Sequence, residues 1–302
     1  MLDYARLTPG PGFQPRAALY YVQRLVPLPG PRRWVARGIA AAINASHGSR
    51  RQTAAAKPAG PWGETLGTIR RDGHARLDGL VTPAAVRDIM AYLAGHQVVA
   101  SDGRSWSLDR VPPGTPMASY PLECLLRCPT ILALINHPAV LECAARYLGC
   151  TPTISSLGVR WSFPAAAGVA DTQLFHRDPD DWRFLKLFVY LTDVDADSGP
   201  HMFVTGSHKT AGRLRARPYS LKEIEATYGP TSVATITGPA GTCFLADTYG
   251  IHRGAVPVSR PRLMLQVQYS LLPIFAFQYQ PMAMEPRPQV DAYVNRLLLR
   301  PS

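Results

Sequence analysis

His176-Arg177-Asp178 is the stretch that decides the fold, together with His252 and Arg262 farther along the chain. Two imidazoles and one carboxylate are the protein ligands of a 2-His-1-carboxylate metal site, which leaves positions open on Fe(II) for a co-substrate and O2. Arg262 follows the second histidine by ten residues, and its guanidinium can hold a carboxylate through two parallel hydrogen bonds. The pattern predicts a non-haem iron oxygenase that uses 2-oxoglutarate.

The spacing of these residues has a structural reason. Side chains two apart in a strand share a face, so His176 and Asp178 can both face a barrel interior while Arg177 points away. The second histidine must come from a strand that is distant in the sequence. Residues 241–247 predict a strand that leads to His252, and the polar alternation within 262–269 is typical of a strand with one wet face. An isolated His-x-Asp triplet is usually a solvated loop; the later histidine, the arginine and the strand-rich setting favour a metal site.

The order of motifs resembles the phytanoyl-CoA dioxygenase-like family of Fe(II)/2-oxoglutarate oxygenases. The motifs that carry this resemblance are the His-x-Asp triplet, the apolar strand Phe184 to Leu191, the acidic turn Asp193 to Pro200, and the block Phe203 to Lys209 that contains Gly-Ser-His. An upstream part of the pattern begins at Asp72-Gly73-His74. The resemblance covers about residues 65 to 275. Its motifs are specific for the chemistry and carry little information about the substrate.

The resemblance implies a mainly β protein with flanking helices (α+β), built on a double-stranded β-helix (jelly roll, cupin-like) barrel. It assigns His176, Asp178 and His252 to iron and Arg262 to the far carboxylate of 2-oxoglutarate, with Fe(II), 2-oxoglutarate and O2 as the cofactor set. Because related halogenases lack the carboxylate ligand, Asp178 predicts hydroxylation or another oxidation.

One position departs from the family pattern. Many relatives have a hydroxyl residue two positions after the arginine, whereas this chain has Met264. A second hydrogen bond to 2-oxoglutarate must therefore come from elsewhere, and the candidates are Lys186, Gln173 and Tyr190.

The net charge of +11 is concentrated at the N-terminus. Residues 1–70 hold ten basic and two acidic side chains, a difference of +8. Such an arm attracts membrane or nucleic-acid phosphates. A helix around Trp34, Ile39 and Ile43 is predicted either to lie on anionic lipid or, the favoured alternative, to pack on the barrel with its arginines in water. We divide the chain into residues 1–62, a basic helical arm and linker, and residues 63–302, the dioxygenase domain.

A second group of residues is assigned to the substrate. Arg213, Arg215 and Arg217 either capture an anionic group near the mouth of the site or belong to a solvated loop. Trp182 either closes over the substrate or serves packing, and His201 is placed near the metal.

Other features bound the function. At 302 residues the chain is long enough for one large β domain with helices packed on it. It has no apolar run of transmembrane length and no signal-peptide pattern at Met1, so we expect a cytoplasmic protein, peripheral on the inner membrane face if the arm binds lipid. The five cysteines are interpreted as small buried apolar residues, because no second cysteine cluster completes a zinc site.

The predicted substrate is anionic, and three classes of function follow. A membrane-borne acidic glycolipid, such as Kdo on a lipid A precursor, accounts for both the arm and the arginines. A CoA thioester or a small natural-product acid uses the arginines alone. A catalytically inactive jelly-roll binding protein is the alternative of another class; nucleic acid is disfavoured because the basic residues are not interleaved with aromatic ones. The sequence does not indicate an oligomeric state.

Overall fold

The computed structural model describes residues 15–26, 28–46, 64–100, 102–164, 174–210 and 218–302. Its centre is an eight-stranded sheet in the order β1-β9-β6-β11-β5-β4-β2-β3, and all neighbouring strands in it are antiparallel. The strands are β1 (His74–Arg76), β2 (Val98–Ala100), β3 (Ser105–Trp106), β4 (Met117–Ser119), β5 (Thr153–Ser162), β6 (Phe184–Tyr190), β9 (Cys243–Ala246) and β11 (Arg262–Ser270).

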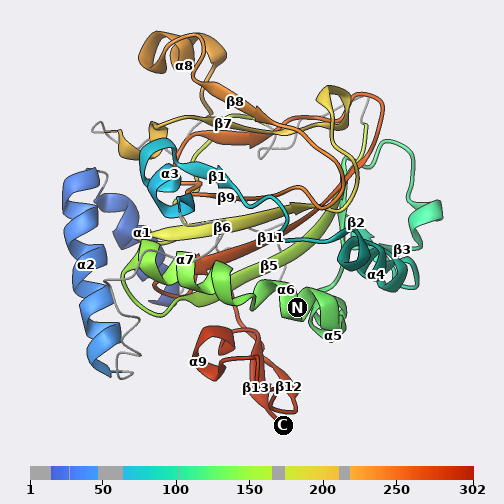
Figure 1. Ribbon diagram of the computed structural model, residues 1–302, viewed down its shortest axis with the longest axis horizontal. Helices are drawn as coiled ribbons and strands as arrows, with labels where there is room; N and C mark the ends of the chain where they lie inside the picture. The colour runs from blue at the N-terminus through green and yellow to red at the C-terminus, as the bar shows by residue number, and fades with distance from the viewer. Residues whose placement is uncertain (1–14, 27, 47–63, 101, 165–173, 211–217) are drawn as a thin grey trace.

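A smaller antiparallel sheet lies opposite the central strands of the large one (Figure 1). Its order is β10-β7-β8, with β7 (His201–Val204), β8 (Val233–Ile236) and β10 (His252–Gly254). Two facing antiparallel sheets form the double-stranded β-helix, so the predicted mainly β fold with flanking helices is confirmed. A short parallel pair, β12 (Met282–Met284) and β13 (Leu299–Pro301), lies near the C-terminus.

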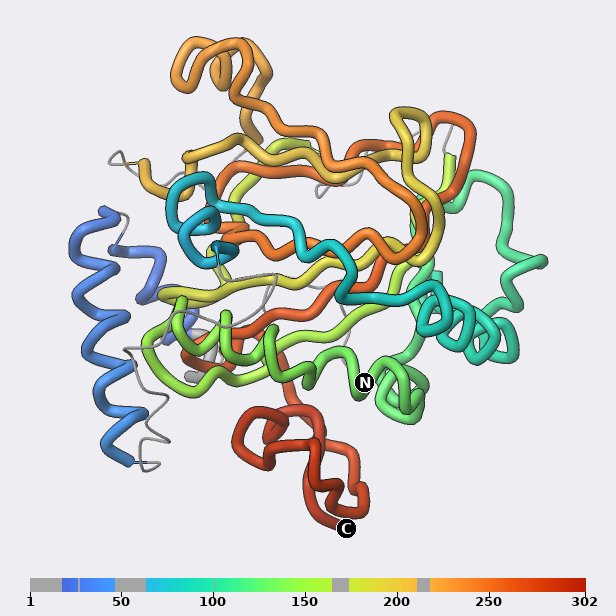
Figure 2. Tube along the Cα trace, viewed as in Figure 1, coloured from blue at the N-terminus to red at the C-terminus, as the bar shows by residue number. Residues whose placement is uncertain are grey.

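Helices cover the outer face of the large sheet and its ends (Figure 1; Figure 2). The α-helices are α1 (Pro15–Leu25), α2 (Pro29–Ser46), α3 (Thr65–Asp72), α4 (Pro83–Ala94), α5 (Leu122–Arg127), α6 (Pro129–Ile135), α7 (Pro138–Leu148), α8 (Leu221–Tyr228) and α9 (Ala292–Asn295). Short 3-10 helices are η1 (Leu108–Arg110), η3 (Ala196–Ser198) and η4 (Ser207–Lys209). In α4 the Thr82 side chain accepts the Ala85 N–H and so caps the N-terminus of the helix.

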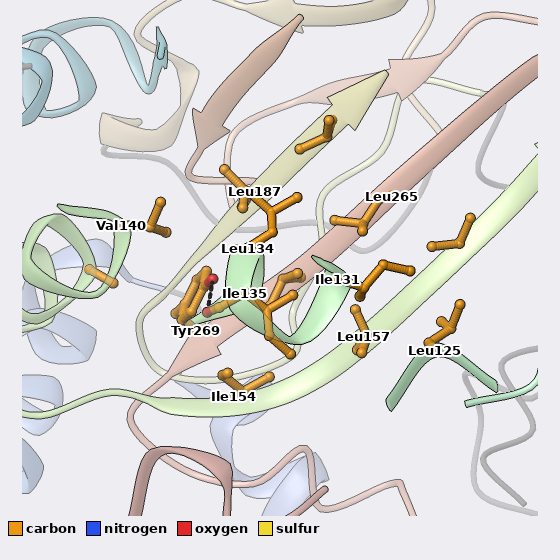
Figure 3. Close-up of a cluster of buried hydrophobic side chains, with 14 of the residues drawn as sticks. Leu125, Ile131, Leu134, Ile135, Val140, Ile154, Leu157, Leu187, Leu265 and Tyr269 are labelled. Carbon is orange, nitrogen blue, oxygen red and sulfur yellow. Dashed lines mark hydrogen bonds between the residues drawn. The ribbon is translucent and has the colours of Figure 1, made fainter. Parts of the chain in front are cut away.

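The central strands separate an apolar face from a polar one by the two-residue period of a strand. Along β11, Leu263, Leu265 and Val267 pack in the core beneath the helices. Figure 3 shows this core, in which side chains of β5, β6 and β11 meet those of α6 and α7. The intervening residues Arg262, Met264 and Gln266 line a pocket on the other face. The face predicted to be wet is therefore largely buried, because the small sheet covers it.

The N-terminal helices α1 and α2 pack against one end of the large sheet (Figure 1). Ala36, Ala40 and Ile43 form the buried stripe of α2, whereas Trp34 is 72% exposed. Of the residues in the predicted helix, Ile43 packs on the sheet and Trp34 does not. The prediction that the arm's arginines lie in water is wrong at Arg32, which is 4% exposed.

The predicted linker falls almost entirely outside the described residues, so the boundary at residue 62 stays a prediction. No helix in the described part of the chain is long and apolar enough to cross a membrane.

Candidate metal centre

Backbone pairing between distant segments brings the metal-binding residues together. His176 and His252 form an isolated antiparallel bridge, with each backbone N–H donating to the other's carbonyl at 2.9 Å. The Asp178 N–H donates to the Thr248 carbonyl at 2.9 Å. The His-x-Asp triplet is thus held by an isolated β-bridge and one further backbone hydrogen bond. Its spacing had suggested a regular strand.

The three side chains converge on one point. His176 Nε2 lies 3.4 Å from Asp178 Oδ1, and His252 Nε2 lies 3.3 Å from Asp178 Oδ2. One ligand atom from each residue lies within 4.8 Å of the other two. This is the 2-His-1-carboxylate set predicted from the sequence.

Hydrogen bonds orient both imidazoles for a metal. His176 Nδ1 lies 2.7 Å from the Leu174 carbonyl oxygen, and His252 Nδ1 lies 3.0 Å from that of Gly250. A carbonyl can only accept, so each Nδ1 carries the proton and each Nε2 keeps its lone pair. Both free lone pairs face Asp178. The donor set therefore fits a divalent metal ion.

Asp178 is kept ionised although it is buried. Burial alone raises the pKa of a carboxyl group, but the Lys186 ammonium and His252 outweigh this effect and hold the pKa of Asp178 well below its usual range. Lys186 Nζ donates to Asp178 Oδ2 at 2.7 Å and lies 3.2 Å from Asp180 Oδ2. The carboxylate is thus available as a ligand at neutral pH.

Arg262 lies in the same pocket and has no anionic partner within the described part of the chain. It is 3% exposed, and among the described residues its Nε and Nη1 have no hydrogen-bond partner. Its Nη2 donates only a long hydrogen bond to Ser162 Oγ, 3.4 Å. Burial, opposed by nearby Tyr190, lowers the pKa of Arg262 to about 10, so the group stays cationic. A buried cation with free donors requires an acceptor from a ligand.

Gly254 makes room for this arginine. A Cβ at this position would lie 2.9 Å from Arg262 Nη2, too close for an unstrained contact. The glycine that ends β10 therefore allows the guanidinium to approach the metal-binding residues.

The other predicted cofactor-binding residues are already engaged or undescribed. Lys186 is bound to the two carboxylates. The Tyr190 hydroxyl donates to the Ile236 carbonyl and accepts the His201 N–H. Gln173 lies outside the described residues.

The predicted substrate residues separate in space. His201 lines the metal pocket, with its ring centroid 5.5 Å from that of His252. Burial and the neighbouring His252 hold the pKa of His201 well below its usual value, so it is neutral. Trp182 instead lines a different cleft, beside Arg32 of α2. Arg213, Arg215 and Arg217 lie outside the described residues.

Sequence reasoning missed four polar residues of the pocket: Arg160, Ser162, Asp180 and Gln266. The first two lie on β5, which pairs with β11 so that Ser162 is opposite Arg262 and Arg160 is opposite Met264. Burial lowers the pKa of Arg160, while Asp178 opposes the shift. The sequence indicated that alternate residues of β5 share a face. Which of the two faces lines the pocket became clear only from the pairing of β5 with β11.

The comparisons with known proteins agree with this geometry. Residues 135–259 match the family model of phytanoyl-CoA dioxygenase (PhyH). Among solved structures, EctD from S. alaskensis, crystallised with 2-oxoglutarate and 5-hydroxyectoine, has a TM-score of 0.51 at 20% identity, covering 78% of this chain and 86% of that one. HygX from Streptomyces hygroscopicus, with nickel, 2-oxoglutarate and hygromycin B bound, has a TM-score of 0.49 at 17% identity, covering 77% and 96%.

The epimerase SnoN of nogalamycin biosynthesis has a TM-score of 0.49 at 23% identity, covering 68% of this chain and 79% of that one. No curated protein matches the sequence. At 20% identity and a TM-score of 0.51, the EctD structure supports the fold alone. The matched family and the triad define an iron- and 2-oxoglutarate-dependent oxygenase. The match to the phytanoyl-CoA dioxygenase (PhyH) model spans residues 135–259, less than half of the chain.

Proposed function

We propose that this protein hydroxylates an anionic organic substrate at the expense of 2-oxoglutarate and O2. The observation that carries the proposal is Arg262, a buried guanidinium with two unpartnered nitrogens in the same pocket as a tautomer-fixed His/Asp/His triad. A dicarboxylate that reaches the metal with one end and Arg262 with the other satisfies both requirements.

Each residue has a distinct task in this proposal. His176, Asp178 and His252 hold Fe(II), which with 2-oxoglutarate and O2 supplies the oxidation of a C–H bond. Arg262 fixes the far carboxylate of 2-oxoglutarate. Lys186 keeps the Asp178 carboxylate ionised and oriented.

The second contact to 2-oxoglutarate is better assigned to β5 than to the residues first considered. Lys186 and the Tyr190 hydroxyl are occupied by protein partners. Ser162 lies beside Arg262, and Arg160 lines the same pocket. We assign the second contact to Ser162, whose hydroxyl takes the place of the one missing at Met264.

Two substrate classes remain, and one observation favours each. Seven of the eleven exposed large apolar side chains in the described chain lie in α1, α2 or between them: Leu19, Tyr21, Val22, Leu25, Leu28, Trp34 and Val35. An apolar surface beside basic residues suits a membrane-borne acidic glycolipid such as Kdo-lipid A, with the protein peripheral on the inner membrane face. A second arginine in the metal pocket, Arg160, instead suits a small natural-product acid or a CoA thioester.

The oxygenase function is tested without knowing the substrate. Metal-free protein is mixed with Fe(II) and 2-oxoglutarate in the absence of O2, and the visible metal-to-ligand charge-transfer band is recorded. We expect the band in the wild type and its loss in His176→Ala. Absence of the band in folded wild-type protein would contradict the proposal and favour the inactive jelly-roll alternative.

Sedimentation with anionic vesicles separates the two substrate classes. If residues 1–46 are required for binding, the glycolipid is supported. If the protein stays in the supernatant, the small acid or CoA thioester is supported.

A further inference from the structure

A strongly basic cleft lies between α2 and the end of the large sheet, and the oxygenase mechanism does not use it. Its volume is about 340 Å³, and no residue that lines it also lines the metal pocket. Figure 1 shows α2 beside α3 and the start of β6 at this end of the molecule. We call it the α2 cleft. Its cationic lining residues are Arg32, Arg33, Arg37, Arg70, Arg183 and Lys209.

Carboxylates of the described residues do not neutralise these six cations. Asp247 is the single acidic residue of the lining. Its Oδ2 accepts the Tyr147 hydroxyl and its Oδ1 accepts the Tyr249 N–H. In the described part of the chain, none of the six cations forms an ion pair with a carboxylate. Six positive charges and one negative charge leave the cleft at +5.

The cations come from separate elements that the fold brings together. Three belong to the first half of α2, one to α3, one precedes β6, and one belongs to η4. Aromatic rings contact three of them, Arg32 among these: Arg183 lies 4.3 Å from the Tyr147 ring centroid and Arg37 lies 5.6 Å from that of Trp34. Convergence of like charges is unfavourable unless an anion binds among them.

Arg32 is a buried cation of the cleft lining. Its guanidinium lies 5.1 Å from the Trp182 ring centroid and 4.8 Å from that of Tyr249, and its Nη2 donates to the Asp181 carbonyl at 2.8 Å. Three buried polar atoms of the cleft lining lack a partner among the described residues: Arg32 Nε, the Tyr249 hydroxyl oxygen and His208 Nδ1. The exposed fraction of Arg32 is 4%. Such atoms require a ligand oxygen or water to satisfy them.

We propose that the α2 cleft binds the phosphate group of a phosphorylated molecule. Phosphate fits because it offers several acceptor oxygens and more than one negative charge, and arginine forks bind it in a bidentate manner. A single carboxylate would leave most of the cations uncompensated. The phosphate belongs either to a soluble phosphate ester or to a lipid headgroup. The proposal does not depend on the oxygenase reaction.

Inorganic pyrophosphate is the probe for a soluble phosphate. Full-length, chelator-treated protein is titrated by calorimetry at low salt in a buffer free of phosphate. The variant is Arg33→Gln/Arg37→Gln, which removes two exposed charges of α2. We expect saturable binding by the wild type and at least about a tenfold loss of affinity in the variant, because charge-assisted hydrogen bonds are lost.

A matched control removes two charges far from the cleft. Arg87 of α4 and Arg110 of η1 are exposed, and α4 lies at the opposite end of the molecule from α2 (Figure 2). Arg87→Gln/Arg110→Gln should bind pyrophosphate like the wild type, because charges beyond a Debye length are screened. Equal losses in both variants would overturn the proposal, since net charge alone would then explain the binding.

A second arm identifies the source of the phosphate. The same proteins are sedimented with vesicles of phosphatidylglycerol and of phosphatidylcholine. Loss of phosphatidylglycerol binding in the α2 variant alone assigns a lipid headgroup, whereas pyrophosphate binding without vesicle binding assigns a soluble phosphate ester. No saturable binding in either arm, or binding that the α2 variant keeps, overturns the proposal.

Discussion

The metal pocket and the α2 cleft handle buried charge in opposite ways. In the metal pocket the two carboxylates, Asp178 and Asp180, share the ammonium of Lys186. In the α2 cleft, six cations face one carboxylate that is already hydrogen-bonded. A protein interior tolerates charge where partners compensate it. The pocket supplies most of its compensation internally and the cleft does not, so the cleft depends more strongly on a ligand.

The largest effect is expected when a metal ligand is removed from the metal pocket, where protein partners compensate most of the buried charge. In His176→Ala or Asp178→Ala, Fe(II) affinity should fall by more than the roughly 100-fold that loss of an outer-shell partner costs, and iron-dependent turnover should disappear. Metal titration of the folded variants measures this loss. Retention of wild-type affinity by either variant would remove that residue from the ligand set.

Removing Arg262 should separate co-substrate binding from metal binding. In Arg262→Ala the dissociation constant for 2-oxoglutarate should rise by about 100-fold, because a buried charge pair loses one partner. Fe(II) affinity should be unchanged. Gly254→Ala should give a smaller loss, since the added Cβ displaces the guanidinium. Calorimetric titration with 2-oxoglutarate measures both, and unchanged binding in Arg262→Ala would assign the far carboxylate elsewhere.

The same comparison explains how much the sequence could predict. The triad and Arg262 were predictable because a motif of three residues, a later histidine and a strand period fix them. Arg160 was not, because its direction depends on the pairing of β5 with β11. The α2 cleft was not predictable either: its residues come from separate elements that only the folded chain brings together. Charge counting located the basic arm but not the burial of Arg32.

For the α2 cleft, the contribution of Arg32 to the free energy of unfolding can be measured. Arg32→Met should lower the free energy of unfolding by about 2 kcal/mol, because the Gln23 and Asp181 carbonyl groups lose their donor. Arg33→Met, exposed on the same helix turn, should change it by less than about 0.5 kcal/mol. Urea denaturation measures both values. Equal effects would mean that Arg32 does not anchor α2 to the sheet.

The smallest expected effect concerns the buried thiol of Cys150, because its neighbours do not offset the rise in pKa that burial causes. Burial raises the pKa of the Cys150 thiol from 9.0 to about 11; nearby Asp181 adds to the shift and Arg296 and Arg183 oppose it. Between these pKa values the folded chain holds a proton that the unfolded chain has lost, so stability falls as pH rises above 9.

From pH 8 to pH 10 this thiol should cost about 1.4 kcal/mol of unfolding free energy. Urea denaturation at the two pH values, in wild type and in Cys150→Ala, isolates this contribution, because the variant lacks the titrating group and should lose less stability by that amount. The same loss in both proteins would show that the Cys150 thiol titrates alike in the folded and unfolded chains. Burial without a partner would then be insufficient to hold a proton at this position, in contrast to the metal pocket, where partners determine the charge of Asp178.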